Sequence, residues 1–395
     1  MAPYPRIQEQ HIAVFGETGS GKTVLLSSFF GPSQERAYAN DLWDLVADDT
    51  GQGNRLYQNY VGMRDRAVAP AATRFSSTTY TFSVKLKSGD VAPRKRPFDV
   101  LRLVWHDYPG EWFQESPSSA AEAADRVTTF RSLLRSDVAL LLVDGQRLLD
   151  HQGEEERYLK SLITNFRQAL LRLKDDVTAD GERLVEFPRI WMIALSKADL
   201  FPDWDVYAFR DLVLGGAADH LDDLRATLQD LIETPDALSV GEDFMLLSSA
   251  KFELSSSTPE PPRIDVTRQV GLDLILPVAA ILPLQRRVAW NSRMEIPRRV
   301  LDTVAHGAEL LAATLGDKGH LRIDKVLNRL PGVGPVAAKL AAPLIVSTVN
   351  VGAQQLRQAN ARARADHDFL TATVTQLSLD LMRGIDDHLL LKSRK

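Results

Sequence analysis

The chain lacks cysteine altogether, although it is 395 residues long. A disulfide framework, a thiol nucleophile and a zinc site made of thiolates are therefore excluded. It also lacks any run of about 18 apolar residues, so no segment is expected to cross a membrane as a helix. Its eight histidines include neither an HxH nor an HExxH pair, so no metal site with histidine ligands is expected.

What is present describes an ordinary globular protein. Hydrophobic residues make up 44% of the chain and charged residues 25%, which are typical values. The length is too great for one core and predicts two domains. Met1–Gln10 is polar and the apolar run at 12–15 is only as long as a strand, so we expect no secretory signal peptide and a cytoplasmic protein.

A glycine-rich segment near the N-terminus is the most informative motif. Residues 16–23 read GETGSGKT, between the apolar runs Ile12–Phe15 and Val24–Leu26, which predicts a strand, a phosphate-binding loop (P-loop) and a helix. The glycines let backbone N–H groups converge on phosphate oxygens, and the helix adds its positive N-terminal end. In this motif Lys22 contacts the outer phosphates and the hydroxyl of Thr23 contacts Mg²⁺. The predicted nucleoside triphosphate ligands are Gly16, Glu17, Thr18, Gly19, Ser20, Gly21, Lys22 and Thr23.

Three further loops follow predicted strands, where ligand loops of an open α/β sheet are expected. Residues 107–110 read DYPG, a DxxG loop whose aspartate can hold Mg²⁺ through water and whose glycine N–H can contact the terminal phosphate. Residues 196–199 read SKAD and resemble the [NT]KxD loop, in which the carboxylate accepts from guanine N1–H and N2–H. Residues 249–251 read SAK and resemble a loop whose alanine N–H contacts guanine O6. The predicted base ligands are Ser196, Lys197, Asp199, Ser249, Ala250 and Lys251.

The four motifs in this order resemble the translation-factor-related (TRAFAC) class of P-loop GTPases, over about residues 10–254. The DYPGEW segment at 107–112 is most similar to the bacterial YcjX-like GTPases. The resemblance implies a Ras-like P-loop NTPase domain of the α/β class. The element pattern itself predicts a mostly parallel, doubly wound sheet with one antiparallel hairpin. The resemblance further implies binding of GTP or GDP with Mg²⁺, and hydrolysis of GTP to GDP and phosphate.

The catalytic residues expected from the resemblance are Lys22, Gly110 and Glu111. Glu111 stands where many small GTPases carry the glutamine that orients the attacking water. A carboxylate beside the γ-phosphate is unfavourable unless a cation screens it, so we expect slow hydrolysis without a partner. Ser196 also departs from the class, which usually carries Asn or Thr there.

The metal ligands are expected to be oxygen donors on three segments. Thr23 and Asp107 are two of them. The third, a threonine that senses the γ-phosphate, is open among Thr73, Thr78 and Thr79. We favour Thr73, because it lies in a loop that nucleotide and Mg²⁺ could order. Residues 68–79 and 107–116 are thus expected to be the switch segments.

The chain is expected to divide at a proline-rich linker. Residues 1–254 are expected to form the GTPase domain, with a helical insertion at about 31–72, and residues 255–262, which read SSSTPEPP, the linker. Residues 263–395 are expected to form an α-helical C-terminal domain. From Asp265 onward this part carries 18 Lys and Arg against 12 Asp and Glu, which fits either an anionic partner or attraction to the acidic first domain.

Signals for partners are weaker. We expect a nucleotide-dependent switch with an unidentified protein effector. One alternative is a dynamin-like GTPase, coupled either to self-assembly as a homodimer or to a membrane surface. The other alternative is a nucleic-acid-associated NTPase. The turn at 330–340 resembles a helix-hairpin-helix, but a tight helix connection is favoured, so nucleic acid is not expected. The apolar segments 272–284 and 340–351 are too short to span a bilayer and are expected to be core. Arg286 begins a basic cluster that is expected to be a solvated helix face.

Overall fold

The computed structural model describes residues 7–71, 77–87, 100–113, 117–177, 190–232, 238–253, 263–286 and 353–393. Its centre is an eight-stranded sheet in the order β10-β7-β6-β5-β1-β4-β3-β2. The pairs from β7 through β4 are parallel, whereas β3 with β4, β2 with β3, and β10 with β7 are antiparallel. The α/β class and the mostly parallel sheet are thus confirmed. The strands are β1 (Ile7–Phe15), β2 (Trp43–Ala47), β3 (Thr78–Leu86), β4 (Val100–Asp107), β5 (Val138–Asp144), β6 (Ile190–Ser196), β7 (Ser239–Leu246) and β10 (Leu390–Leu391).

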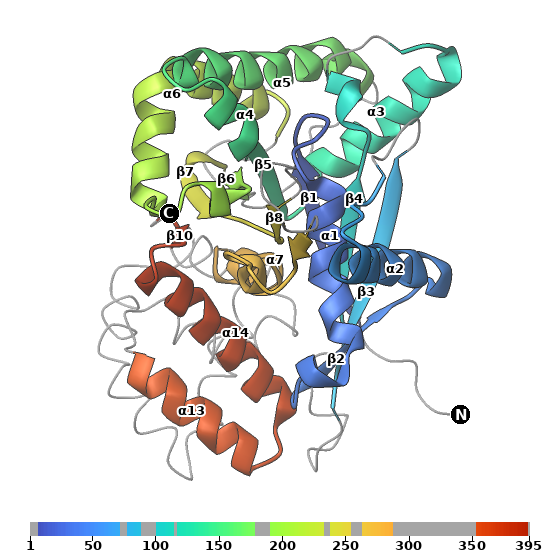
Figure 1. Cartoon of the computed structure of the whole chain (residues 1–395), viewed down its shortest axis with the longest axis vertical. Coiled ribbons are helices and arrows are strands. Elements are labelled where there is room, and N and C mark those ends of the chain that lie inside the picture. The colour runs from blue at the N-terminus through green and yellow to red at the C-terminus, as the bar shows by residue number, and fades with distance from the viewer. Residues whose placement is uncertain are drawn as a thin grey trace, which may run out of the picture.

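Helices cover both faces of the sheet, which is why the central strands β5 and β6 are apolar over almost their whole length. Alternate residues of a strand face opposite sides: Ile12 and Val14 join one core with α1, α7 and α14, and Ala13 and Phe15 join another with α3, α5 and α6. Figure 1 shows α5 and α6 on one side of the sheet and α7, α13 and α14 on the other. The helices are α1 (Lys22–Phe30), α2 (Thr50–Arg66), α3 (Ala120–Leu134), α4 (Gly145–Asp150), α5 (Glu155–Val177), α6 (Val206–Gln229), α7 (Ile275–Ala280), α13 (Ala353–Ala365) and α14 (Phe369–Asp386).

The predicted helical insertion at 31–72 also contains a strand. Helix α2 is present, and the Asp49 side chain caps it by accepting from the N–H of Gln52 at 2.8 Å. Before it, β2 pairs with β3 and extends the sheet by one edge strand. Only Trp43 in this five-residue strand is buried, so pairing rather than a strong apolar pattern stabilises it.

The expectation that the part after residue 262 is all helical is wrong in two places. Strand β10 adds a further strand beside β7. Strand β9 (Arg263–Asp265) pairs with β8 (Lys251–Glu253) in a small second sheet. The helical C-terminal region itself is confirmed by α13 and α14.

The C-terminal helices share a core with the sheet. Residues of α7 and α14 belong to the same cluster as Ile12 and Val14 of β1. Arg286, expected on a solvated face, is instead buried and pairs with the fully buried Asp243 of β7 at 2.5 Å, because a charge in that core needs a partner. The remaining arginines of its cluster, the linker 255–262, the turn at 330–340 and the apolar segment 340–351 lie outside the described residues. The domain boundaries therefore stay a prediction.

Candidate nucleotide site

Four loops at the carboxyl ends of the strands line one cavity of about 430 Å³. They follow β1, β4, β6 and β7, which lie close together because the parallel strands end at the same edge of the sheet. The predicted ligands in its lining are Thr18, Gly19, Ser20, Gly21, Lys22, Thr23, Gly110, Ser196, Lys197, Asp199, Ser249 and Ala250. Lys251 is not in the lining; it lies in β8, half exposed, and pairs with Glu253 at 2.7 Å.

The loop after β1 has the conformation that its glycines permit. Gly19 and Gly21 have φ values of 88° and 91°, which side-chain-bearing residues rarely adopt. The buried Lys22 amine donates to the carbonyl oxygens of Gly16 at 2.7 Å and Glu17 at 3.1 Å. Burial lowers the pKa of Lys22 to about 8, opposed by nearby carboxylates, Asp107 foremost. An anionic ligand beside this amine would favour its charged form.

Ser20 supports the same interpretation. Its hydroxyl is buried in the cavity lining and has no hydrogen-bond partner among the described residues. A buried hydroxyl without a partner costs free energy. A phosphate oxygen in the cavity would supply the missing partner, so the P-loop fits a nucleotide phosphate.

The DxxG loop after β4 is docked on the P-loop. The hydroxyl of the fully buried Tyr108 accepts from the N–H of Gly16 at 2.7 Å, and the Lys22 amine lies 5.3 Å from the centre of the Tyr108 ring. A Cβ on Gly110 would lie 2.4 Å from the backbone nitrogen of Thr18, so only glycine allows this approach. Tyr108 was not among the predicted site residues, although it lies inside the DYPG motif.

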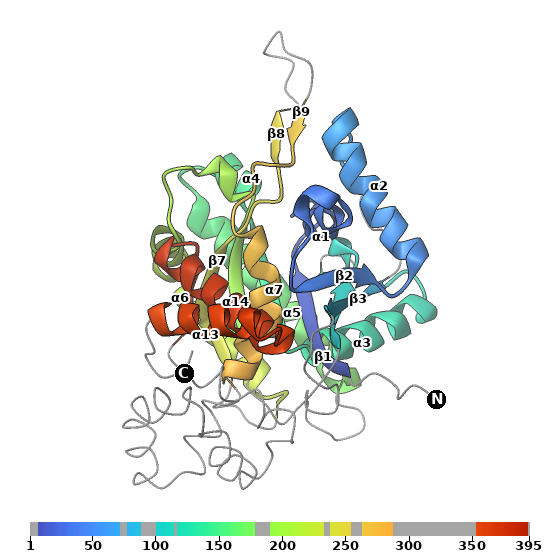
Figure 2. The same cartoon turned by 90° about the horizontal axis from the view of Figure 1, so that it is seen from below.

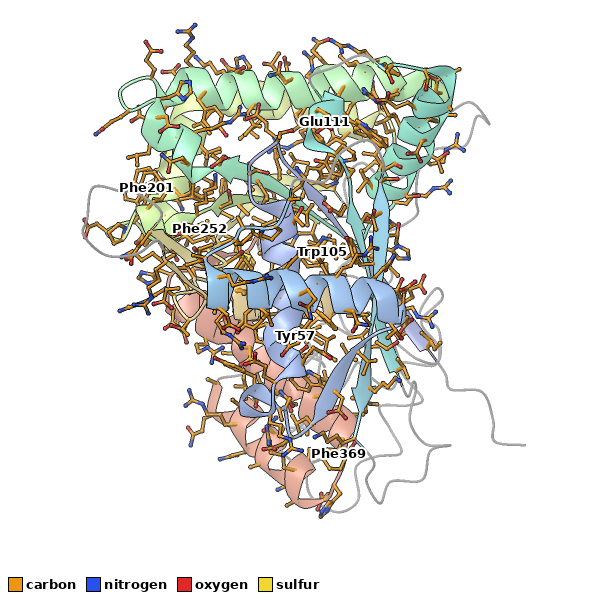
Figure 3. All side chains as sticks on the ribbon, turned by 45° about the vertical axis from the view of Figure 1, so that its right-hand side comes forward. Tyr57, Trp105, Glu111, Phe201, Phe252 and Phe369 are labelled. Atoms are coloured by element: carbon orange, nitrogen blue, oxygen red, sulfur yellow. The ribbon has the colours of Figure 1, made fainter. Side chains whose placement is uncertain are left out.

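Glu111 and Trp112 continue from this loop in opposite environments. Thr18 Oγ1 donates to Glu111 Oε2 at 3.4 Å, which places the carboxylate beside the P-loop (Figure 3). Trp112 is buried, its carbonyl accepts from Arg126 at 3.2 Å, and the guanidinium lies 5.4 Å from its ring. The predicted switch segment at 107–116 is therefore anchored at Trp112 to α3; residues 114–116 lie outside the described residues.

The predicted Mg²⁺ ligands are oxygen donors on neighbouring elements. Thr23 lines the cavity, and Asp107 is buried at the end of β4, close enough to Lys22 to raise its pKa. A hydroxyl, a carboxylate and nucleotide phosphates are the donors that Mg²⁺ prefers, so these residues fit that ion. Thr73 lies outside the described residues, and Thr78 and Thr79 open β3 opposite Asp107 and His106. Within the described part of the chain, no group of three or more His, Asp or Glu could hold another metal.

The base side of the cavity is made by the loops after β6 and β7. Asp199 Oδ1 accepts from the hydroxyl of Ser248 at 2.5 Å, which orients its carboxylate. Ala198 N–H donates to the carbonyl of Leu247 at 3.0 Å, so the two loops are joined. Ser196, where the class usually has Asn or Thr, donates to the carbonyl of Val143 at 3.2 Å and so braces the loop against β5.

Helix α2 covers the loop after β7. Tyr60 and Met63 of α2 form a small core with Ala250, Ile264 and Val266, and Figure 2 shows α2 beside the β8–β9 hairpin. The segment after α2 returns to the cavity, where residues 69–71 join its lining. The predicted insertion therefore connects the loop after β7 with residues 69–71, which belong to the segment expected to be the first switch.

A fifth element, the turn between β5 and α4, also belongs to the site and was missed from the sequence. Gln146 lines the cavity, and Asp144 caps α4 by accepting from the N–H of Gln146 at 3.0 Å. A Cβ on Gly145 would lie 2.5 Å from the carbonyl oxygen of Ser196. The sequence signal that could have identified this turn is the pair Asp144-Gly145 directly after the apolar run 138–143. The other candidate loops were likewise identified by their place directly after a predicted strand.

One family model matches the part of the chain that holds three of the motifs. Residues 10–211, about half of the chain, match the family described as Double-GTPase 2 (DO-GTPase2). No curated protein matches. Among solved structures, the chain is similar to one from work on an oligomerised bacterial dynamin pair that provides a mechanism for long-range sensing and tethering of membranes. Identity is 13% and the TM-score 0.24, with 96% of this chain and 60% of that chain covered; a similarity of that degree carries no conclusion here.

The family match spans the P-loop, the DxxG loop and the SKAD loop, and these three loops meet in one cavity with the SAK loop. The chain therefore belongs to the Double-GTPase 2 family and is a P-loop GTPase.

Proposed function

We propose that this chain binds GTP with Mg²⁺, hydrolyses it to GDP and phosphate, and acts as a nucleotide-dependent switch. The observation that supports this most is the convergence of the P-loop with the DxxG, SKAD and SAK loops on one cavity of about 430 Å³. That size falls within the range of about 300–1,000 Å³ typical of small-molecule sites.

Guanine specificity is proposed to come from Asp199 and Ala250, which both line the cavity. The carboxylate accepts from N1–H and N2–H of guanine, whereas adenine has an acceptor in place of N1–H. Each charge-assisted hydrogen bond contributes about 1.5–3 kcal/mol, which is enough to separate the two bases. Competition of unlabelled GTP and ATP against a fluorescent guanine nucleotide tests this. Equal displacement by ATP and GTP would contradict the guanine assignment.

On the phosphate side, each residue has a proposed part. The Lys22 amine neutralises the outer phosphates, and the N–H of Gly110 donates to the γ-phosphate. Thr23 and Asp107 would hold Mg²⁺, which supplies charge neutralisation to the phosphates when it is bound. Glu111 orients the attacking water, but its own charge beside the phosphate keeps unaided hydrolysis slow.

The finer assignment is also a proposal. We place the chain in the TRAFAC class, nearest the YcjX-like GTPases because of its DYPGEW segment, and in the cytoplasm. Among the residues that the structure describes, no helix has the length and apolar character needed to cross a membrane. The output is a protein effector that reads the switch segments, identified by pull-down with the GTP-bound chain. The alternatives are homodimerisation, binding to a membrane surface and binding to nucleic acid. Sedimentation with and without GTP tests the first, co-sedimentation with liposomes the second, and co-sedimentation with DNA the third.

A further inference from the structure

The turn between β5 and α4 forms two ion pairs, one with each end of the nucleotide site. Arg147 donates to Glu17 Oε2 at 2.7 Å, and so connects α4 with the P-loop across 130 positions in the sequence. Lys197 lies 2.7 Å from Asp144 Oδ1, and so connects the SKAD loop with the end of β5. The β5–α4 turn is therefore joined to the P-loop and to the SKAD loop, and of these four residues Lys197 lines the cavity.

Glu17 makes the first of these pairs necessary. It is an acid in a loop that must accept phosphates, and its side chain is only 9% exposed. Its charge reaches the P-loop amine, because it is one of the carboxylates that raise the pKa of Lys22. A buried carboxylate interacts strongly with neighbouring charges, so it would repel a polyphosphate unless a cation offsets it.

Arg147 is held in place by its surroundings. Its backbone carbonyl lies 2.7 Å from Nδ1 of His151, and the His151 ring stacks on Tyr158 with 5.6 Å between the ring centres. The Tyr158 hydroxyl accepts in turn from the N–H of Asp144 at 3.1 Å. The short helix α4 is thereby fixed against α5, and this fixes the position of the Arg147 backbone from which its side chain extends to Glu17.

We propose that Arg147 is a positioning residue of the nucleotide site, which holds the Glu17 carboxylate against α4 and offsets its charge, so that polyphosphate affinity depends on this ion pair. The inference rests on the proposed binding of guanine nucleotides. It requires no contact between Arg147 and the nucleotide. The effect is larger for GTP than for GDP, because the triphosphate carries more negative charge.

Four variants test this: Arg147→Ala, Arg147→Lys, Glu17→Gln and the double variant Glu17→Gln/Arg147→Ala. The measurement is the Kd of fluorescent GTP and GDP with Mg²⁺ at two ionic strengths, with thermal unfolding recorded beside it. Arg157→Ala is the matched control, because Arg157 is 79% exposed and pairs with the exposed Glu154.

Arg147→Ala is expected to weaken GTP binding about tenfold or more, and GDP binding less, because the Glu17 carboxylate in the P-loop then loses the guanidinium that offsets its charge. Arg147→Lys keeps the charge and retains most of the affinity. The Kd of the double variant for GTP is expected to lie within about twofold of the Kd of Glu17→Gln. Once Glu17 is replaced by Gln, there is no carboxylate charge for Arg147 to offset, so removing Arg147 as well changes little. The control changes Kd by less than about twofold.

Two results would overturn the inference but not the proposed function. One is an unchanged affinity of Arg147→Ala for GTP. The other is a double variant that binds GTP about tenfold more weakly than Glu17→Gln, which would show that Arg147 contacts the nucleotide directly. The second comparison decides the matter even if Arg147→Ala does not fold. Absence of guanine-nucleotide binding by the unmutated chain would instead overturn the proposed function, and the inference with it.

Discussion

The hydroxyl of Tyr108 accepts a hydrogen bond from the backbone N–H of Gly16 at 2.7 Å, across 92 positions in the sequence. Burial raises the pKa of this phenol well above its usual value, so the hydroxyl stays protonated at physiological pH. The DxxG loop and the first glycine of the P-loop are therefore joined, and movement of the DxxG loop away from the P-loop must break this bond.

Tyr108→Phe is expected to lower the free energy of unfolding by about 1–3 kcal/mol, because the buried N–H of Gly16 loses its acceptor. Urea denaturation measures this. Hydrogen exchange of residues 107–113 is expected to increase at the same time. Tyr38→Phe serves as the control, because Tyr38 is 53% exposed and its change is expected to stay within about 0.5 kcal/mol. Equal effects of the two variants would show that the bond to Gly16 contributes nothing.

Asp199→Asn is expected to weaken the binding of GTP about a hundredfold and to strengthen the binding of xanthosine triphosphate. The amide can donate to the extra carbonyl at C2 of xanthine, and it can no longer accept two hydrogen bonds from guanine. Competition binding with GTP, xanthosine triphosphate and ATP measures the exchange of specificity. If the variant still binds GTP more tightly than xanthosine triphosphate, Asp199 does not contact the base.

Lys22→Ala is expected to reduce GTP hydrolysis at least about a hundredfold, since the only cation of the P-loop is lost from the transition state. Phosphate release under single-turnover conditions measures it. Lys160→Ala removes a lysine from the exposed face of α5, where it pairs with Glu156, and provides the control. Hydrolysis by Lys22→Ala at the unmutated rate would place the active site elsewhere.

Glu111 is tested by two replacements that differ in charge. Glu111→Ala removes the group beside Thr18 and is expected to lower kcat at least about tenfold, with little change in the Kd for GTP. Glu111→Gln keeps the shape and removes the charge that repels the γ-phosphate, so it is expected to hydrolyse GTP at least as fast as the unmutated chain. Turnover that is the same in all three proteins would show that Glu111 has no part in hydrolysis.

Local signals in the sequence were sufficient for the central sheet and for the loops at its edge. Strands β5 and β6 are continuous apolar runs because helices bury both of their faces, and a glycine or an aspartate stands at the end of β1, β4 and β5. The P-loop needs only its own spacing, since Gly19 and Gly21 take up positive φ values within the motif. The candidate loops could therefore be placed without any knowledge of tertiary contacts, although the roles of their residues stay predictions.

What could not be predicted depends on contacts between distant segments. Strands β2 and β10 are five and two residues long, too short for a periodic pattern, and pairing with β3 and β7 forms them. Tyr108 and Arg147 each act on the P-loop from about a hundred positions away or more, so no local pattern reveals their partners. Arg286 looked like part of a surface cluster because its partner, Asp243, is remote in sequence.

The position of β10 has a consequence for synthesis of the chain. Until residues 390–391 have left the ribosome, the outer edge of β7 has no strand beside it, and Asp243 lacks the N–H of Ser393, which donates to it at 2.8 Å in the complete fold. An open strand edge is a template for pairing with other chains. The central sheet is therefore completed only after residues 390–391 have emerged, long after the nucleotide motifs, and β7 is open to non-native pairing until then.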